Sequence, residues 1–170
     1  MKLFICFIFW LLGIFLAFSL HYSFVENDKD SQTHRDKIHN VQVEKKAGTY
    51  PERVKELFLH NLFVAFLLSI GGLFTAGSLS LIVLLYNGFI ATSSIINIVQ
   101  QSSLLNILPN LTHAPFEIVA LIWFGSIGLS GTTLISNFIK EKITITDFYA
   151  LQNVWKPIIL LLIAALIEAK

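Results

Sequence analysis

Two titratable side chains, His113 and Glu117, stand four residues apart and offer the most suggestive chemistry in the sequence. On one continuous helix they would share a face, where an imidazole and a carboxylate could hold a metal ion or relay a proton. His60, near the start of another apolar stretch, could act as a third ligand. A metal site needs at least three converging ligands, and Pro115 disfavours a continuous helix. We therefore predict no metal or cofactor, and keep these three residues as functional candidates.

Glu117 is the only charged residue between positions 57 and 139. An ionisable group inside a membrane is a functional hypothesis by default, because its loss of hydration must be offset by partners. A structural interpretation competes with this one. Pro115 suits the first position of a helix, and an acid in the first turn meets the positive end of the helix dipole. The sequence leaves both interpretations open and slightly favours the structural one.

Three asparagines, Asn61, Asn87 and Asn97, interrupt otherwise apolar stretches. Their amides must find partners in lipid, so we expect them to face inward and tie helices together rather than line a transport path. Asn61 and Asn87 are further functional candidates. Small residues let helices approach closely. The glycines expected to pack helices in this way are Gly71, Gly72, Gly125, Gly128 and Gly131.

The composition of the whole chain is that of a membrane protein. Its 170 residues are 55% hydrophobic and only 14% charged, and the mean hydropathy is +0.70. A soluble domain is nearer a quarter charged, so an ordinary water-soluble enzyme and a disordered chain are excluded. The net charge of +1 gives no field that would attract nucleic acid. The single cysteine, Cys6, excludes an internal disulfide.

The elements that must position these residues are long apolar helices. A helix needs about 20 apolar residues to cross about 30 Å of hydrocarbon. Thr49 and Glu52 fit a capping box, which predicts that the second helix begins before it enters the bilayer. We therefore predict an all-α fold, an integral membrane helical bundle of about five transmembrane helices. These helices are expected at residues 3–22, 57–74, 79–99, 115–138 and 154–167.

The charge distribution divides the chain into four parts. A signal peptide is an alternative for the first part, but its apolar run is long for one, so we expect an uncleaved anchor. The membrane orientation stays open. The basic residues of the loop favour a cytoplasmic loop, whereas the lysine before the anchor favours a cytoplasmic N-terminus. The parts are an N-terminal transmembrane anchor (1–25), a charged loop ending in an interfacial helix start (26–56), a membrane core of three helices (57–139), and a short polar loop with a C-terminal transmembrane helix (140–170).

Two stretches of this sequence, one from Leu59-His60-Asn61 to Gly88-Phe89 and one at residues 108–120 with His113 and Glu117, resemble motifs of the stage II sporulation protein M family. In that family a proline-histidine-glycine triplet is followed by a glutamate. His113 and Glu117 match the two polar members, while Thr112 and Ala114 replace the proline and the glycine. The resemblance covers about residues 57–139. It rests on Leu59-His60-Asn61 through Ala65, Gly71-Gly72, Thr75, Leu84-Leu85-Tyr86-Asn87-Gly88-Phe89, and residues 108–120.

The resemblance implies a multi-pass protein of the bacterial cell membrane without established catalysis. In spore formers such a protein is a scaffold for enzymes that remodel peptidoglycan, and similar small proteins occur beside circular bacteriocins, with roles in maturation, export or producer immunity. We accordingly expect a non-enzymatic accessory or scaffold protein. Its expected partners are the lipid bilayer and other membrane proteins, either peptidoglycan hydrolases or an ABC transporter with a small peptide, and no nucleic acid.

One further alternative is an intramembrane enzyme or a transporter subunit that uses Glu117 and His113. The sequence contains no nucleophile elbow, phosphate-binding loop or paired acids. No catalytic residue is therefore assigned.

Overall fold

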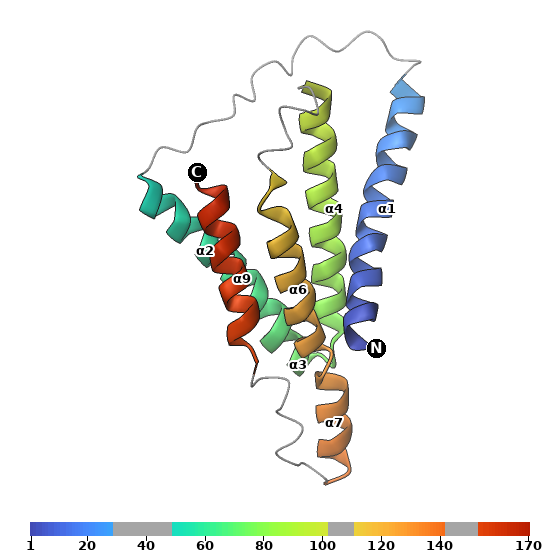
Figure 1. The fold of residues 1–170 in the computed structure, drawn as a ribbon. Coiled ribbons are helices and arrows are strands. Elements are labelled where there is room, and N and C mark those ends of the chain that lie inside the picture. Colours follow the sequence, from blue (N-terminus) through green and yellow to red (C-terminus); the bar gives the residue numbers. More distant parts are fainter. Residues whose placement is uncertain (29–48, 102–110, 142–152) are drawn as a thin grey trace.

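The computed structural model describes residues 1–28, 49–101, 111–141 and 153–170. Within these ranges every regular element is a helix (Figure 1). Most of the predicted charged loop, the polar segment after the third helix and the polar loop before the last one lie outside the described residues. The helices are α1 (Lys2–Asp28), α2 (Tyr50–Phe66), the π-helix η2 (Leu67–Gly71), α3 (Gly72–Phe74), α4 (Ser78–Gln101), α6 (Ala114–Gly128), α7 (Gly131–Ile139) and α9 (Trp155–Glu168).

The expected all-α membrane bundle is confirmed. The last predicted crossing forms α9, whose 14 residues extend only about 21 Å, less than the roughly 30 Å of a hydrocarbon layer. The described residues thus contain a shorter fifth helix beside four full-length candidate crossings. These four are Lys2–Ser23, Tyr50–Phe74, Ser78–Gln100 and Ala114–Ile139.

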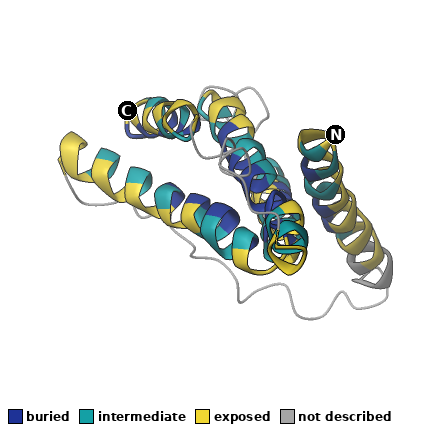
Figure 2. Ribbon diagram, turned by 90° about the horizontal axis from the view of Figure 1, so that it is seen from below, coloured by how far each residue is buried: buried dark blue, intermediate teal, exposed yellow. Residues whose placement is uncertain are grey.

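Helix α6 lies at the centre of the bundle and contacts α1, α2, α4 and α9. Helix α1 runs beside α4, and α9 lies against α2 and α6 (Figures 1 and 2). The core where these helices meet includes Cys6, Leu84, Phe124 and Leu161, all buried. Gly125 of α6 faces Leu84, because a Cβ there would stand 2.6 Å from a methyl carbon of that leucine. A small residue in the central helix therefore makes room for a large one in its neighbour.

The outer surface of the bundle is apolar. Phe15 is 66% exposed, Phe63 62% and Ile82 64%. In water such surface would favour association, whereas hydrocarbon solvates it well. The exposed side chains of the long helices therefore suit contact with lipid (Figure 2).

The tightest helix contact joins the η2–α3 segment to α4 and α6. The carbonyl of Leu68 in the π-helical turn accepts a hydrogen bond of 2.7 Å from the hydroxyl of Ser80. A Cβ on Gly128 would overlap both of these oxygen atoms, and a Cβ on Gly72 would overlap the hydroxyl of Ser80. Backbone therefore packs on backbone here, in the way that small residues allow in membrane bundles.

Two glycines that were not singled out from the sequence bring α1 against α4. A Cβ on Gly13 would overlap the carbonyl oxygen of Leu85, and a Cβ on Gly88 would overlap that of Trp10. The two contacts are reciprocal, one glycine on each helix facing backbone of the other. This explains why α1 and α4 remain close along the bundle.

The fourth crossing expected at residues 115–138 corresponds to the apolar span Ala114–Ile139, which a turn at Leu129 and Ser130 divides into two helices. The chain forms α6 and α7, which meet at Ser130. The ammonium group of Lys2 donates to the hydroxyl of Ser130 (3.2 Å), and Gly131 packs against the backbone of Leu73. These contacts hold the junction while α7 extends past the other helices (Figure 1).

The capping box predicted before the second helix is present, and it starts that helix earlier than residue 57. The backbone N–H of Thr49 donates to the carboxylate of Glu52 (2.8 Å), and α2 begins at Tyr50. The tight turn that follows α3 contains Ala76 and Gly77, both with positive φ (52° and 84°). Glycine adopts that backbone region without strain.

We expect the substitution Gly128→Ala to lower the free energy of unfolding by about 1–3 kcal/mol, because its methyl group would overlap the backbone of η2. Gly71→Ala is the matched control. The added Cβ would meet only the flexible end of Leu79. Because alanine has a higher helix propensity than glycine, the free energy of unfolding of this variant should be unchanged or slightly higher. Denaturation of both purified variants in detergent measures the difference, and equal stability would contradict the packing described.

Candidate functional site

A cavity of about 440 Å³ lies between α1, α4, α6 and α9. Its apolar wall includes Trp10 of α1 and Ile95 of α4. Three of the residues singled out from the sequence line it: Asn87 of α4, and His113 and Glu117 at the start of α6. The polar side chains that line the cavity are Asn87, Thr92, Ser94, His113, Glu117 and Glu168.

The start of α6 positions the histidine and the first glutamate. His113 immediately precedes α6, and Glu117 lies in its first turn. The backbone N–H of Glu117 donates to the carbonyl of His113 (3.3 Å), so one helical turn stacks their side chains on the same face. Pro115 fits this turn because the first N–H groups of a helix have no partner within it. The proline marks the start of the helix and does not separate the pair.

Glu168, the last residue of α9, completes the cluster. One ligand atom each from His113, Glu117 and Glu168 lies within 4.8 Å of the others. Nε2 of His113 is 3.7 Å from Oε2 of Glu168, and the two side chains are 16% and 33% exposed. Two carboxylates so close together repel each other unless a proton or a cation lies between them.

Glu168 is not among the residues that the sequence analysis singles out. Five alternating helices bring the start of the fourth and the end of the last to the same end of the bundle, and this signal could have identified it. The hydroxyl of Tyr50 donates to the carbonyl of Leu166 (3.0 Å). This bond ties the start of α2 to the end of α9, and α9 also packs against α6 (Figure 1).

Of the remaining candidates, Asn87, Asn61 and His60, only Asn87 lines the cavity. The amide nitrogen of Asn87, on α4, donates to the carbonyl of Val83 one turn earlier (2.8 Å). Asn61 is buried in α2 and is absent from the lining of the cavity. His60 is exposed and lies outside the three-residue cluster. The structure thus brings Asn87, but neither residue of α2, to the cavity wall.

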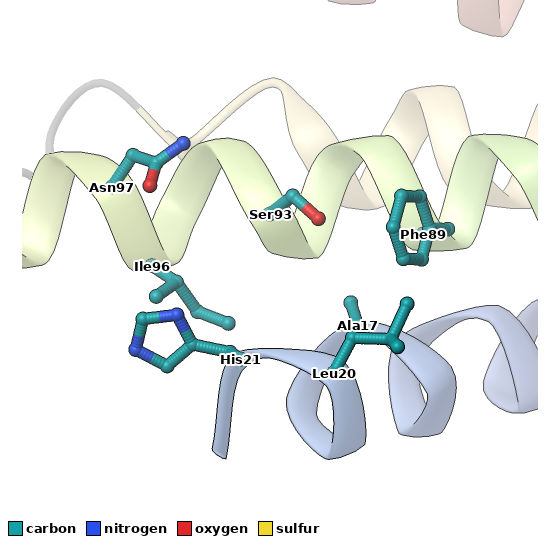
Figure 3. Close-up of a pocket in the computed structure, with 7 residues that line it drawn as sticks. All are labelled: Ala17, Leu20, His21, Phe89, Ser93, Ile96 and Asn97. Atoms are coloured by element: carbon teal, nitrogen blue, oxygen red, sulfur yellow. The ribbon is translucent and has the colours of Figure 1, made fainter. Parts of the chain in front are cut away.

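A second cavity, of about 200 Å³, lies between α1 and α4 (Figure 3). Nε2 of His21 stands 3.0 Å from the amide nitrogen of Gln100. Because His21 is the only titratable side chain in this lining, the cavity offers fewer partners for chemistry than the first one. Its lining residues are Ala17, Leu20, His21, Phe89, Ser93, Ile96 and Asn97.

Comparison with known families gives one match, to the family model described as Stage II sporulation protein M, over residues 3–170. The chain belongs to the stage II sporulation protein M family. The match extends on both sides of the resemblance at residues 57–139, so it includes α1, α9 and Glu168. A search of curated proteins and a search of solved structures found no significant match.

In this member of the family, the cluster combines an imidazole with two carboxylates at a junction of helices. Such a set can bind a divalent cation or exchange protons. Since His113 and Glu117 come from α6 and Glu168 from α9, anything that binds all three also links the two helices. The full chemistry of the cluster thus depends on α9 being docked.

A cross-linking experiment tests this docking. In a Cys6→Ser background, the pair His113→Cys and Glu168→Cys should be joined by a short thiol-reactive cross-linker, because the native side chains approach within 3.7 Å. The control pair His113→Cys and Trp155→Cys places the second thiol about 20 Å away along α9. Mass spectrometry of the linked peptides measures both yields, and equal yields would contradict the docked position of α9.

Proposed function

We propose that the chain is a non-enzymatic accessory or scaffold protein that crosses the bacterial cell membrane several times and acts by binding a partner membrane protein. Its membership of the stage II sporulation protein M family and its four apolar helices of spanning length support this proposal. The main structural support for the proposal is a polar group on the outer surface of α4.

That group is the hydroxyl of Tyr86. The side chain is 62% exposed and makes no hydrogen bond within the described part of the chain. It lies about 12 Å along α4 from Ser78, inside the stretch suited to hydrocarbon. An unpaired hydroxyl costs free energy in lipid, and a neighbouring transmembrane helix with an acceptor would remove that cost.

The surroundings of Tyr86 suit such a helix. Ile82, Tyr86 and Ile90 follow one another at intervals of four residues and are all exposed, so they form one continuous face of α4. Apolar side chains with a few hydroxyl groups are typical of faces that pack helices in membranes. The proposed partner therefore contributes a transmembrane helix with a hydrogen-bond acceptor opposite Tyr86.

The identity of the partner separates the two biological settings that the family resemblance leaves open. A peptidoglycan hydrolase or its membrane anchor would indicate a role in remodelling the cell wall. A component of an ABC transporter, together with a small apolar peptide, would indicate maturation, export or immunity for a circular bacteriocin.

The cavity favours one second candidate, a transport or enzymatic role for Glu117 and His113. In this role Glu117 binds or exchanges a proton or a cationic substrate within the cavity. The substitution Glu117→Gln would remove the charge while keeping the shape. If the variant left the flux of the proton or cationic substrate and the resistance of the producing cell to its bacteriocin unchanged, the second candidate function would be contradicted. The proposed scaffold function would not be affected.

Affinity purification from host membranes in mild detergent tests the leading proposal. The wild-type chain should recover a second membrane protein in a fixed ratio, and Tyr86→Phe should reduce that recovery about 3- to 20-fold, the loss expected for one hydrogen bond in a membrane. Ile82→Trp should reduce it as well, by a steric clash on the same face.

Tyr22→Phe is the matched control. Tyr22 is 71% exposed near the end of α1, so this substitution removes an equivalent hydroxyl group from a different helix. Its recovery of the partner should equal that of the wild type. Repeated isolation of the wild-type chain as a functional monomer without a partner would overturn the proposal.

A further inference from the structure

The proposed docking face on α4 makes no use of the cluster formed by His113, Glu117 and Glu168. Their ligand atoms, one from each side chain, lie within 4.8 Å of one another. They line a cavity whose remaining described walls contain no lysine or arginine. The two carboxylates therefore face each other without a permanent cation in the same cavity.

The position of Glu168 makes this arrangement harder to explain by helix stability alone. Glu117 lies in the first turn of α6, where an acid meets the positive end of the helix dipole. Glu168 lies in the last turn of α9, where an acid meets the negative end. A positive charge between the two glutamates would offset both this dipole interaction and their mutual repulsion.

The charged groups of the neighbouring helix supply only part of that charge. Arg53 of α2 lines a separate cavity of about 180 Å³ with Glu56 and Glu168. Its Nε is buried and has no hydrogen-bond partner in the described chain. His60, also on α2, is exposed and outside the cluster. Neither residue lines the cavity that the three ligand atoms share.

We propose that His113, Glu117 and Glu168 bind one divalent metal ion, with Zn²⁺ the best match, and that the ion clamps the end of α9 to the start of α6. An imidazole nitrogen and carboxylate oxygens are ordinary zinc ligands, and three protein ligands leave a fourth position for water. Ligand atoms around a tetrahedral zinc stand about 3.3 Å apart, so small side-chain rotations from the present spacing complete the site.

The charge balance also favours a divalent ion over a monovalent one. Two carboxylates and a neutral imidazole carry a charge of about −2, which a divalent cation cancels within a largely apolar cavity. Asn87 lines the same cavity, and the bond from its amide nitrogen to Val83 fixes the orientation of the side chain.

This inference is independent of the proposed function, because a metal clamp on α6 and α9 could serve a scaffold or a transporter equally. Its test therefore measures metal binding and stability, not biological activity. The full-length protein, purified in detergent and stripped with a chelator, is dialysed against Zn²⁺, and in parallel against Mn²⁺ and Mg²⁺. Bound metal is then quantified by mass spectrometry.

We expect about one Zn²⁺ per chain, and a higher melting temperature in the presence of zinc than with chelator. Glu168→Gln and His113→Gln should each weaken zinc binding by at least about 10- to 100-fold and abolish the shift in melting temperature. His21→Gln is the matched control, because that histidine lines the other cavity, and it should bind zinc as the wild type does.

Chelator-treated variants that elute at the same volume as the wild type on size exclusion show that loss of zinc is not loss of fold. Two results would overturn the proposal. One is a wild-type protein that binds no zinc and shows no zinc-dependent change in melting temperature. The other is undiminished zinc binding when both Glu168→Gln and His113→Gln are introduced together.

Discussion

Hydrocarbon cannot form hydrogen bonds, and this constraint determines how the chain distributes its polar groups. Several hydroxyl groups within the long helices donate to carbonyls of their own helix, as Ser69 and Thr92 do one turn back. Ser80 instead satisfies the carbonyl of Leu68 in the π-helical turn of a neighbouring helix. The charged cluster is confined to the start of α6 and the end of α9. Aromatic and aliphatic side chains are left to form the outer surface.

Without a hydrophobic force between helices in lipid, close backbone contact becomes the main source of packing. The contacts of Gly13 with α4, of Gly88 with α1, and of Gly128 with the backbone of Leu68 and Gly72 are of this kind. Gly128, the last residue of α6, holds that end of the helix against the η2–α3 segment, and the first turn of the same helix carries Glu117.

Much of the fold could be predicted from the sequence, because hydrocarbon excludes charge and the uncharged stretches reveal the helices directly. The capping box at Thr49 is equally local and equally visible. The break at Ser130 and the π-helical turn were not predicted, because both depend on contacts between helices that the apolar pattern does not encode. The family resemblance covered residues 57–139, although the family extends over 3–170.

The sequence identifies only part of the candidate site, because the site also depends on contacts between helices. His113 and Glu117 stand close in sequence, and one helical turn brings them together. Glu168 joins them from about fifty positions away through the docking of α9, while His60, the third ligand considered at first, lies outside the cluster. Convergence is a property of tertiary structure, and an isolated acid at the end of an apolar helix gives little sign of it.

The account depends on lipid being the solvent of the long helices, and membrane fractionation tests this most directly. After cell lysis the full-length chain should sediment with the membranes, remain there through an alkaline carbonate wash, and enter solution only with detergent. A chain that stays in the supernatant of high-speed centrifugation without detergent, folded and monodisperse, would contradict the account.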